Sequence, residues 1–281
     1  SSIRFINDLS GFAMKVLKFG GSSLASAARF AEVAHIVHQQ SLVEPLILVL
    51  SAPQGVTNSL LRLVEQARTG ADCSADLQQL RGRLQELVEA AKPLLDPGQF
   101  EALQRFSEQH LETIGQYAQG IRLLSYCPDS IQARILGAGE QFSVRLMQAL
   151  LQARQARCAV LDAAQLVRSQ GDYLNAVADI PATQAAFAAL DFQDGVAIRI
   201  MAGFVSGLPN GEMALLGRNG SDYSAAIIAA GVKASAREIW TDVDGVYSAD
   251  PRQVKNAKLI EQLSYAEAME LSYFGAKVLH P

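Results

Sequence analysis

A lysine beside paired glycines is the feature of this sequence best suited to chemistry. In the segment Val16-Leu17-Lys18-Phe19-Gly20-Gly21-Ser22-Ser23, the lysine lies in a short apolar run, Met14 to Phe19, that predicts a buried strand. Backbone N–H groups around paired glycines can form an anion-binding concavity, to which Lys18 adds a positive charge. A helical pattern follows at once, and a helix N-terminus favours anions. Together these features predict a phosphate cradle; the alternative is a surface lysine followed by a tight turn.

A second glycine-rich loop carries a cation and an anion, in Gly217-Arg218-Asn219-Gly220-Ser221-Asp222 before an alanine-rich helical pattern. Arg218 can grip a carboxylate with its bidentate fork. Ser221 and the N–H groups of the following helix can meet a phosphate. Asp222, at the helix start, can orient a lysine or hold Mg²⁺. The alternative is an aspartate that caps the helix beside a surface arginine.

A third segment, Thr241-Asp242-Val243-Asp244-Gly245-Val246-Tyr247, follows a predicted strand and precedes Asp250-Pro251-Arg252. A strand that ends in Thr-Asp, with a turn and an aromatic residue after it, is consistent with the rim of a nucleotide site. Turn chemistry alone explains most of this pattern.

Several other kinds of site are not indicated. The sequence has no G-x-x-x-x-G-K-[ST] loop and no G-x-S-x-G elbow. Gly137-Ala138-Gly139-Glu140 is nearest to a dinucleotide fingerprint, but it lacks the third glycine and falls inside a helical pattern. His35 and His38 are three residues apart without further ligands beside them, so a solvated helix face is favoured over a metal site.

Composition narrows the class of protein. The 281 residues are 49% hydrophobic and 19% charged, with a net charge of −4, as in ordinary globular proteins. Because no basic block is present, neither nucleic acid nor a membrane is an expected partner. The longest apolar runs are far too short to cross a bilayer. Three widely spaced cysteines suit unpaired thiols in a reducing compartment, which favours a cytoplasmic protein.

Alternating strand and helix patterns predict an α/β fold with a mainly parallel sheet. Residues 75–126 have helical periodicity without strand patterns, which predicts a helical insertion or lid, and one long helix is expected from Asp129 to about Ala156. Residues 1–13 precede Met14 and are expected to be an extension or frayed leader. The further expected strands lie at 46–50, 158–161, 196–201 and 238–241, with a hairpin around 209–211.

Six motifs in fixed order make the sequence resemble the aspartokinases, members of the amino-acid kinase family. Within that family the sequence is most similar to the kinase half of bifunctional aspartokinase–homoserine dehydrogenases, and the resemblance covers nearly everything after Met14. The motifs are KFGGSS (18–23), LSAPQGVTN (50–58), GAGE (137–140), GRNGSDYSA (217–225), TDVDGVYSADPR (241–252) and ELSYFGAKVLHP (270–281).

The resemblance implies a three-layer α/β/α sandwich around a mainly parallel, eight-stranded sheet. Residues 14–281 would form the catalytic domain, with the amino acid bound over its N-terminal half and ATP over its C-terminal half. Regulatory and dehydrogenase domains would lie outside these residues. The implied enzyme is a cytoplasmic homo-oligomer that uses ATP and Mg²⁺ to phosphorylate L-aspartate, the first step of lysine, threonine and methionine biosynthesis.

The resemblance also implies a role for individual side chains. Lys18 would neutralise charge on the transferring phosphoryl group, and Asp222 would hold it in place. Arg218 would pair with the substrate α-carboxylate and Glu140 with its α-ammonium group. The remaining implied residues are Ser51 and Thr57 beside the acceptor, and Gly20, Gly21, Ser22, Ser221, Thr241, Asp242, Tyr247, Arg252 and Lys277 around the nucleotide.

Two alternatives remain open at this point. One is another amino-acid kinase or a carbamate kinase of the same fold; the pairing of Arg218 with Glu140 favours an acceptor that carries both α-groups. The other is a catalytically silent domain that binds an amino acid or a nucleotide, against which the presence of Lys18, Asp222 and Lys277 argues.

Overall fold

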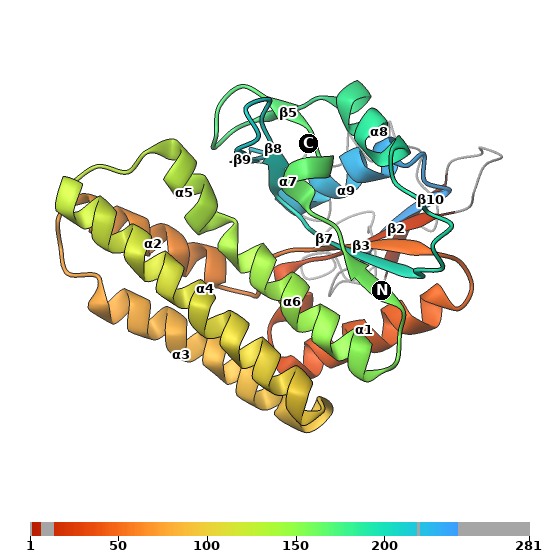
Figure 1. Cartoon of the computed structure of the whole chain (residues 1–281), viewed down its shortest axis with the longest axis horizontal. Helices are drawn as coiled ribbons and strands as arrows, with labels where there is room; N and C mark the ends of the chain where they lie inside the picture. Colours follow the sequence, from red (N-terminus) through yellow and green to blue (C-terminus); the bar gives the residue numbers. More distant parts are fainter. Residues whose placement is uncertain (1, 7–13, 218–219, 241–281) are drawn as a thin grey trace, which may run out of the picture.

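A mainly parallel sheet lies at the centre of the molecule (Figure 1). The computed structural model describes residues 2–6, 14–217 and 220–240. Within them the sheet has six strands in the order β1-β10-β2-β3-β7-β4, all parallel to their neighbours except β1, which is antiparallel to β10. The expected count of eight strands is therefore not confirmed. The strands are β1 (Ser2–Ile6), β2 (Lys15–Phe19), β3 (Leu46–Leu50), β4 (Cys158–Val160), β7 (Ile198–Ala202) and β10 (Ala236–Trp240).

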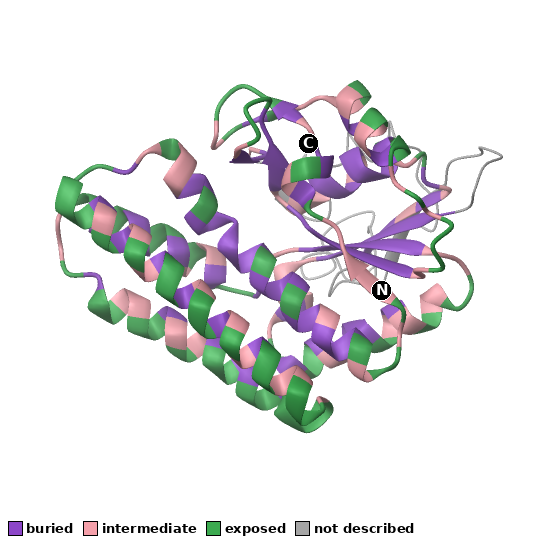
Figure 2. Ribbon diagram, viewed as in Figure 1, coloured by how far each residue is buried: buried purple, intermediate pink, exposed green. Residues whose placement is uncertain are grey.

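The central strands are apolar because helices cover both faces of the sheet. Every residue of β2, β3 and β7 is buried, as is typical of a parallel sheet between helix layers (Figure 2). Helix α9 (Gly220–Gly231) covers one face, and α1 (Ala27–Ser41) and α6 (Ala138–Ala153) cover the other (Figure 1). This arrangement confirms the three-layer α/β/α architecture.

A bundle of long helices lies beside the sheet. It contains α2 (Val56–Arg68), α3 (Ser74–Ala91), the short η2 (Lys92–Leu94) and α4 (Pro97–Leu124), which confirms the helical insertion predicted over 75–126. Asp96 begins α4 with a capping box, since its carboxylate accepts from the Gln99 N–H and the Gln99 side chain accepts from the Asp96 N–H. Figure 1 shows the bundle alongside the sheet.

The single helix expected over 129–156 is wrong. The segment forms two helices, α5 (Asp129–Leu136) and α6, interrupted at Gly137. A Cβ at Gly137 would lie 3.1 Å from Met213 Cε and 3.2 Å from Val205 Cγ2. Because glycine has no side chain, the backbone between the two helices can pack closely against the neighbouring hairpin. As a result, Glu140 lies in the first turn of α6 rather than in the middle of a long helix.

The remaining elements are short. Strands β8 and β9 form the predicted hairpin, and Ser2–Ile6 forms an edge strand that was not expected in the leader-like first 13 residues. The additional elements are η1 (Gly21–Leu24), α7 (Ala163–Leu166), β5 (Ser169–Gln170), β6 (Val177–Ala178), α8 (Ile180–Ala188), β8 (Val205–Gly207) and β9 (Met213–Leu215).

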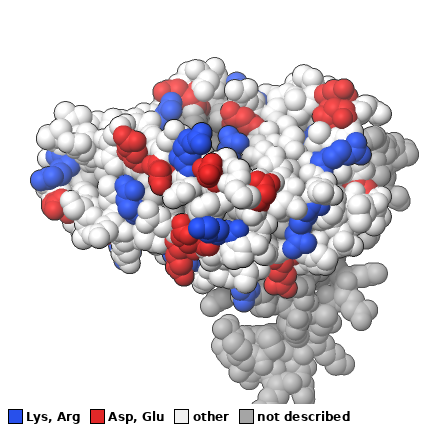
Figure 3. All heavy atoms as spheres, turned by 60° about the horizontal axis from the view of Figure 1, so that its bottom comes forward, with Lys and Arg blue, Asp and Glu red and all other residues white. Residues whose placement is uncertain are grey.

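Acidic and basic side chains are interspersed on the face of the molecule drawn in Figure 3. Among the described residues of that face, neither sign of charge forms a broad continuous patch. None of the helices in the described ranges combines the length and the apolar character needed to cross a membrane.

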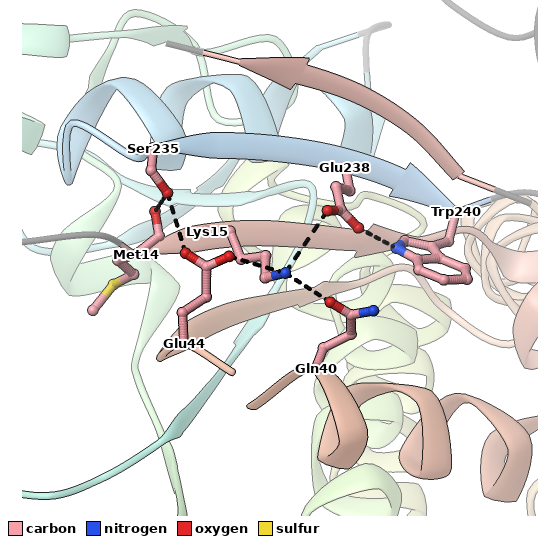
Figure 4. A network of polar contacts seen from close by, with 7 residues as sticks. All are labelled: Met14, Lys15, Gln40, Glu44, Ser235, Glu238 and Trp240. Atoms are coloured by element: carbon pink, nitrogen blue, oxygen red, sulfur yellow. Dashed lines mark hydrogen bonds and ion pairs between the residues drawn. The ribbon is translucent and has the colours of Figure 1, made fainter. Parts of the chain in front are cut away.

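A buried ionic network joins β2 and β10 to the end of α1 and to the segment before β3 (Figure 4). Lys15, with 5% of its side chain exposed, lies 3.0 Å from Glu44 and 3.9 Å from Glu238, and donates to Gln40 at 2.7 Å. The Trp240 indole N–H donates to Glu238 at 3.1 Å. A buried charge is stabilised only when it is paired, so Lys15 compensates two carboxylates that belong to different parts of the chain.

We expect Lys15→Met to lower the free energy of unfolding by about 3 kcal/mol, because it removes the buried ammonium group that lies 3.0 Å from the Glu44 carboxylate. Denaturant titration of the 281-residue chain measures this loss. Lys92→Met is the matched control: Lys92 is exposed above the Phe100 ring, and its loss should cost less than about 1 kcal/mol. Equal losses in the two variants would contradict the structural role of the network.

Candidate active site

The register of the sheet brings three loops to one edge. Phe19 at the end of β2 is paired with Leu50 at the end of β3, and Leu50 is paired with Ala202 at the end of β7. The loops that begin at Gly20, Ser51 and Gly203 therefore leave the sheet side by side. In open α/β sheets, ligands bind outside the carboxyl ends of the strands, so this edge is where a site is expected.

An ion pair joins strand β2, just before the first of these loops, to α9. Lys18 Nζ lies 2.6 Å from Asp222 Oδ1, with 11% and 31% of the two side chains exposed. Lys18 lies within β2, between the fully buried Leu17 and the nearly buried Phe19, and Asp222 lies in the first turn of α9. The structure thus brings together the two residues that sequence analysis assigned to catalysis, from opposite ends of the chain.

The glycine pair after β2 leaves the backbone open around the Lys18 ammonium group. A Cβ at Gly20 would lie 3.3 Å from Lys18 Nζ, and one at Gly21 would lie 3.0 Å from the Ala52 carbonyl oxygen. Gly21 therefore permits the close approach of the loops after β2 and β3. This glycine loop and the Lys18 ammonium group are the parts of the predicted phosphate cradle, and they lie next to each other.

A cleft of about 380 Å³ opens beside this ion pair. Its polar side chains include Ser51, Thr57, Ser221 and Glu140, and the Ser51 hydroxyl donates to the Ser221 hydroxyl at 2.7 Å. Ser221 also connects the cleft to Asp222, the next residue of α9. The cleft is lined by Gly21, Ser22, Ser51, Ala52, Pro53, Gln54, Gly55, Thr57, Glu140, Phe204 and Ser221. None of these residues comes from α3 or α4, so the helical insertion does not line this cleft.

Glu140 is the most unusual side chain of the cleft. It is 4% exposed, and its Oε2 has no hydrogen-bond partner among the described residues. Burial raises the pKa of Glu140 to about 7, although hydrogen bonds to the backbone of Glu140 itself and of Ala52 oppose that rise. A buried carboxylate with an unpartnered oxygen is suited to binding a cationic group of a ligand.

Close packing positions the turn that carries Glu140. A Cβ at Gly139 would lie 2.6 Å from Ala52 Cβ and 3.2 Å from Val56 Cγ1, so only glycine allows this turn of α6 to approach the loop after β3. The approach places the Ala52 backbone beside the Glu140 carboxylate.

Five of the residues that line the cleft were not predicted as site residues: Ala52, Pro53, Gln54, Gly55 and Phe204. Ala52 contacts the loop of Gly21 and the turn of Glu140, and Phe204 forms part of the wall after β7. Phe204 has a φ of 66°, which is strained for a bulky residue, and its N–H donates to Ser224 Oγ at 2.6 Å. The motif LSAPQGVTN indicated the region of Ala52, but no pattern in the sequence singled out Phe204.

Several predicted site residues lie outside the described residues. These are Arg218, Thr241, Asp242, Tyr247, Arg252 and Lys277. In the part of the chain that the structure does describe, no group of three or more His, Cys, Asp or Glu side chains could hold a metal ion.

Comparison with known proteins gives consistent results. The bifunctional aspartokinase/homoserine dehydrogenases of Buchnera aphidicola and Haemophilus influenzae are 38% and 39% identical to this chain over 269 residues, which is 95% of the chain. The chain spans about a third of the length of these relatives. A solved structure of Escherichia coli aspartokinase III in complex with aspartate and ADP superposes with a TM-score of 0.84 at 32% identity, covering 95% of this chain and 58% of that one.

Residues 13–281 match the amino acid kinase family. The match includes the lysine–glycine loop after β2, the cleft and the start of α9. The chain therefore belongs to the amino acid kinase family.

Proposed function

We propose that this chain is the catalytic domain of an aspartate kinase. It would transfer the γ-phosphoryl group of ATP to the side-chain carboxylate of L-aspartate and form 4-phospho-L-aspartate. The observation that carries the proposal is the ion pair of Lys18 with Asp222 next to a cleft that contains the buried Glu140. Similarity to a solved aspartokinase that holds aspartate and ADP supports the same activity.

On the acceptor side, Glu140 binds the α-ammonium group of aspartate. An anion that is buried with one unpartnered oxygen gains most from a cation placed against it. Ser51 and Thr57 border the side-chain carboxylate, and Arg218 pairs with the α-carboxylate through its fork. A carbamate acceptor has no ammonium group and leaves Glu140 without a function, so an amino acid is the better substrate.

On the donor side, Lys18 lies between the two substrates and stabilises the negative charge that is transferred. Asp222 fixes the ammonium group of Lys18 at 2.6 Å. Gly20, Gly21, Ser22 and Ser221 offer hydrogen-bond donors to the phosphates. The other nucleotide contacts belong to residues outside the described ranges, namely Thr241, Asp242, Tyr247, Arg252 and Lys277.

The reaction needs no general base, because the aspartate side chain, with an ordinary pKa of about 4, is already ionised at neutral pH. Catalysis then consists of positioning and charge stabilisation, as in other phosphoryl transfers. Mg²⁺ bound to the phosphates would neutralise further charge on the donor. From the resemblance to the aspartokinases alone, we also propose that the protein self-associates and acts in the cytoplasm.

We expect Lys18→Met to lower kcat by at least about 100-fold, because it removes a cation from the transferring group. Trapping of the acyl phosphate with hydroxylamine measures the reaction. Lys92→Met, which changes an exposed lysine of the helical bundle, should keep wild-type turnover. Near-native turnover of the Lys18→Met variant would contradict a catalytic role for Lys18.

Arg218→Ala should raise the KM for aspartate at least about tenfold and leave the KM for ATP within about twofold, because a fork that binds a carboxylate contributes on the order of 1.5–3 kcal/mol. Steady-state kinetics with each substrate varied in turn give both constants. Equal increases in the two KM values would place Arg218 on the nucleotide side instead.

The pKa of Glu140 gives the activity a defined pH dependence. With a pKa of about 7, Glu140 binds an ammonium group only after it loses its proton, so the KM for aspartate should fall about tenfold between pH 6 and pH 8. Glu140→Gln should raise this KM and abolish its pH dependence. A wild-type KM that stays constant over this range would argue against Glu140 as the ammonium site.

The stability of the protein should follow the same titration. Between the ordinary glutamate pKa and about 7, the unfolded state loses the Glu140 proton while the folded state keeps it, so this group makes the protein less stable as pH rises. Glu140→Gln lacks this penalty. Its Tm relative to wild type should therefore increase between pH 5 and pH 8, which thermal unfolding without substrate can measure.

A further inference from the structure

A histidine of the helical bundle reaches the turn that carries Glu140. His110, on α4, has its Nε2 2.8 Å from the carbonyl oxygen of Ala138, the first residue of α6. A carbonyl oxygen can only accept a hydrogen bond, so Nε2 carries the proton and donates it. The imidazole ring stacks on Phe106, one turn earlier in α4, with ring centroids 5.1 Å apart.

The hydrogen bond from His110 lies at the irregular junction between α5 and α6. The chain is interrupted at Gly137, and the bond from the Gln141 N–H to the Gly137 carbonyl is long, at 3.3 Å. The first turn of α6 is therefore held from outside as well as by its own hydrogen bonds. Gly139 packs against Ala52 on one side, and His110 holds the Ala138 carbonyl from α4.

The helical bundle makes a comparable contact with the segment that follows β2 and contains the glycine pair. Arg83 of α3 donates to the Ala25 carbonyl at 2.5 Å, just after η1, which begins at Gly21. Helices α3 and α4 thus contact the backbone near the glycine pair and near Glu140, although none of their residues lines the cleft. This arrangement assigns the helical bundle a supporting role at the site.

We propose that His110 is a positioning residue that fixes Glu140 for binding the ammonium group of the acceptor amino acid. The proposal rests on the proposed function, because it deepens the role given to Glu140. His110 does not line the cleft and acts only through the first turn of α6. Burial lowers the pKa of His110, which keeps the ring neutral at neutral pH, so that it acts as a hydrogen-bond donor rather than as a second charge.

Two substitutions separate the hydrogen bond from the packing. His110→Phe keeps an aromatic ring for the stack on Phe106 but removes the donor, whereas His110→Gln restores an N–H at nearly the position of Nε2. We expect His110→Phe to raise the KM for aspartate about fivefold, corresponding to one hydrogen bond, with kcat and the KM for ATP within about twofold of wild type. His110→Gln should restore most of the affinity, and His35→Phe, at an exposed histidine of α1, should change nothing.

A second measurement does not depend on turnover. The Glu140 carboxyl group can be followed by ¹³C NMR in the absence of substrate, with its signal assigned by Glu140→Gln. If His110 holds the turn, His110→Phe lets water reach the carboxylate and lowers the pKa of Glu140 below its wild-type value of about 7, whereas His110→Gln keeps that value.

The two measurements distinguish the possible failures. If wild type phosphorylates aspartate but His110→Phe changes neither the KM for aspartate nor the Glu140 titration, the positioning role is wrong and the kinase assignment stands. If wild type does not phosphorylate aspartate, the proposed function fails, and the NMR titration still decides whether His110 fixes Glu140. A kcat and both KM values that change together in His110→Phe would indicate a general structural effect and overturn the proposal.

Discussion

The contact between Lys18 and Asp222 is the interaction on which the rest of the site depends. Lys18 lies in β2, which has a strand on each side, so its ammonium group loses most of its hydration. The Asp222 carboxylate compensates for that loss of hydration. The first turn of α9 supplies that carboxylate and so fixes this helix on the sheet. Because Ser221 precedes Asp222, the same turn also closes one side of the cleft, and the hydroxyl pair of Ser51 and Ser221 follows from it.

The two buried charges of the site differ in how far the protein satisfies them. Lys18 has a protein partner at close range, whereas Glu140 keeps one oxygen without a partner in the described residues. The first arrangement holds a cation at a fixed position for charge that develops during a reaction. The second leaves an anion whose unfavourable burial is relieved when a cationic ligand binds. This asymmetry is consistent with one site that binds a phosphate donor and an amino acid together.

Local patterns in the sequence predicted much of the fold but less of the site. The strand Leu46–Leu50 and the helices that flank Asp96 were predicted correctly, because an apolar run and a Pro-Gly helix start are local features. The helix break at Gly137 was missed, and the residues packed against it there belong to a hairpin that is distant in the sequence. Phe204 and His110 were missed for the same reason: only the folded chain places them beside the cleft and the turn of Glu140.

The position of β10 in the sheet has a consequence for synthesis of the protein. Strand β2 forms near the beginning of the chain, but one of its two neighbours, β10, spans Ala236–Trp240. During translation, the edge of β2 on that side stays unpaired until most of the domain has left the ribosome, and contacts between such distant segments form slowly. An apolar strand with an open edge can associate with other chains, so this edge of β2 is open to aggregation until β10 has been synthesised.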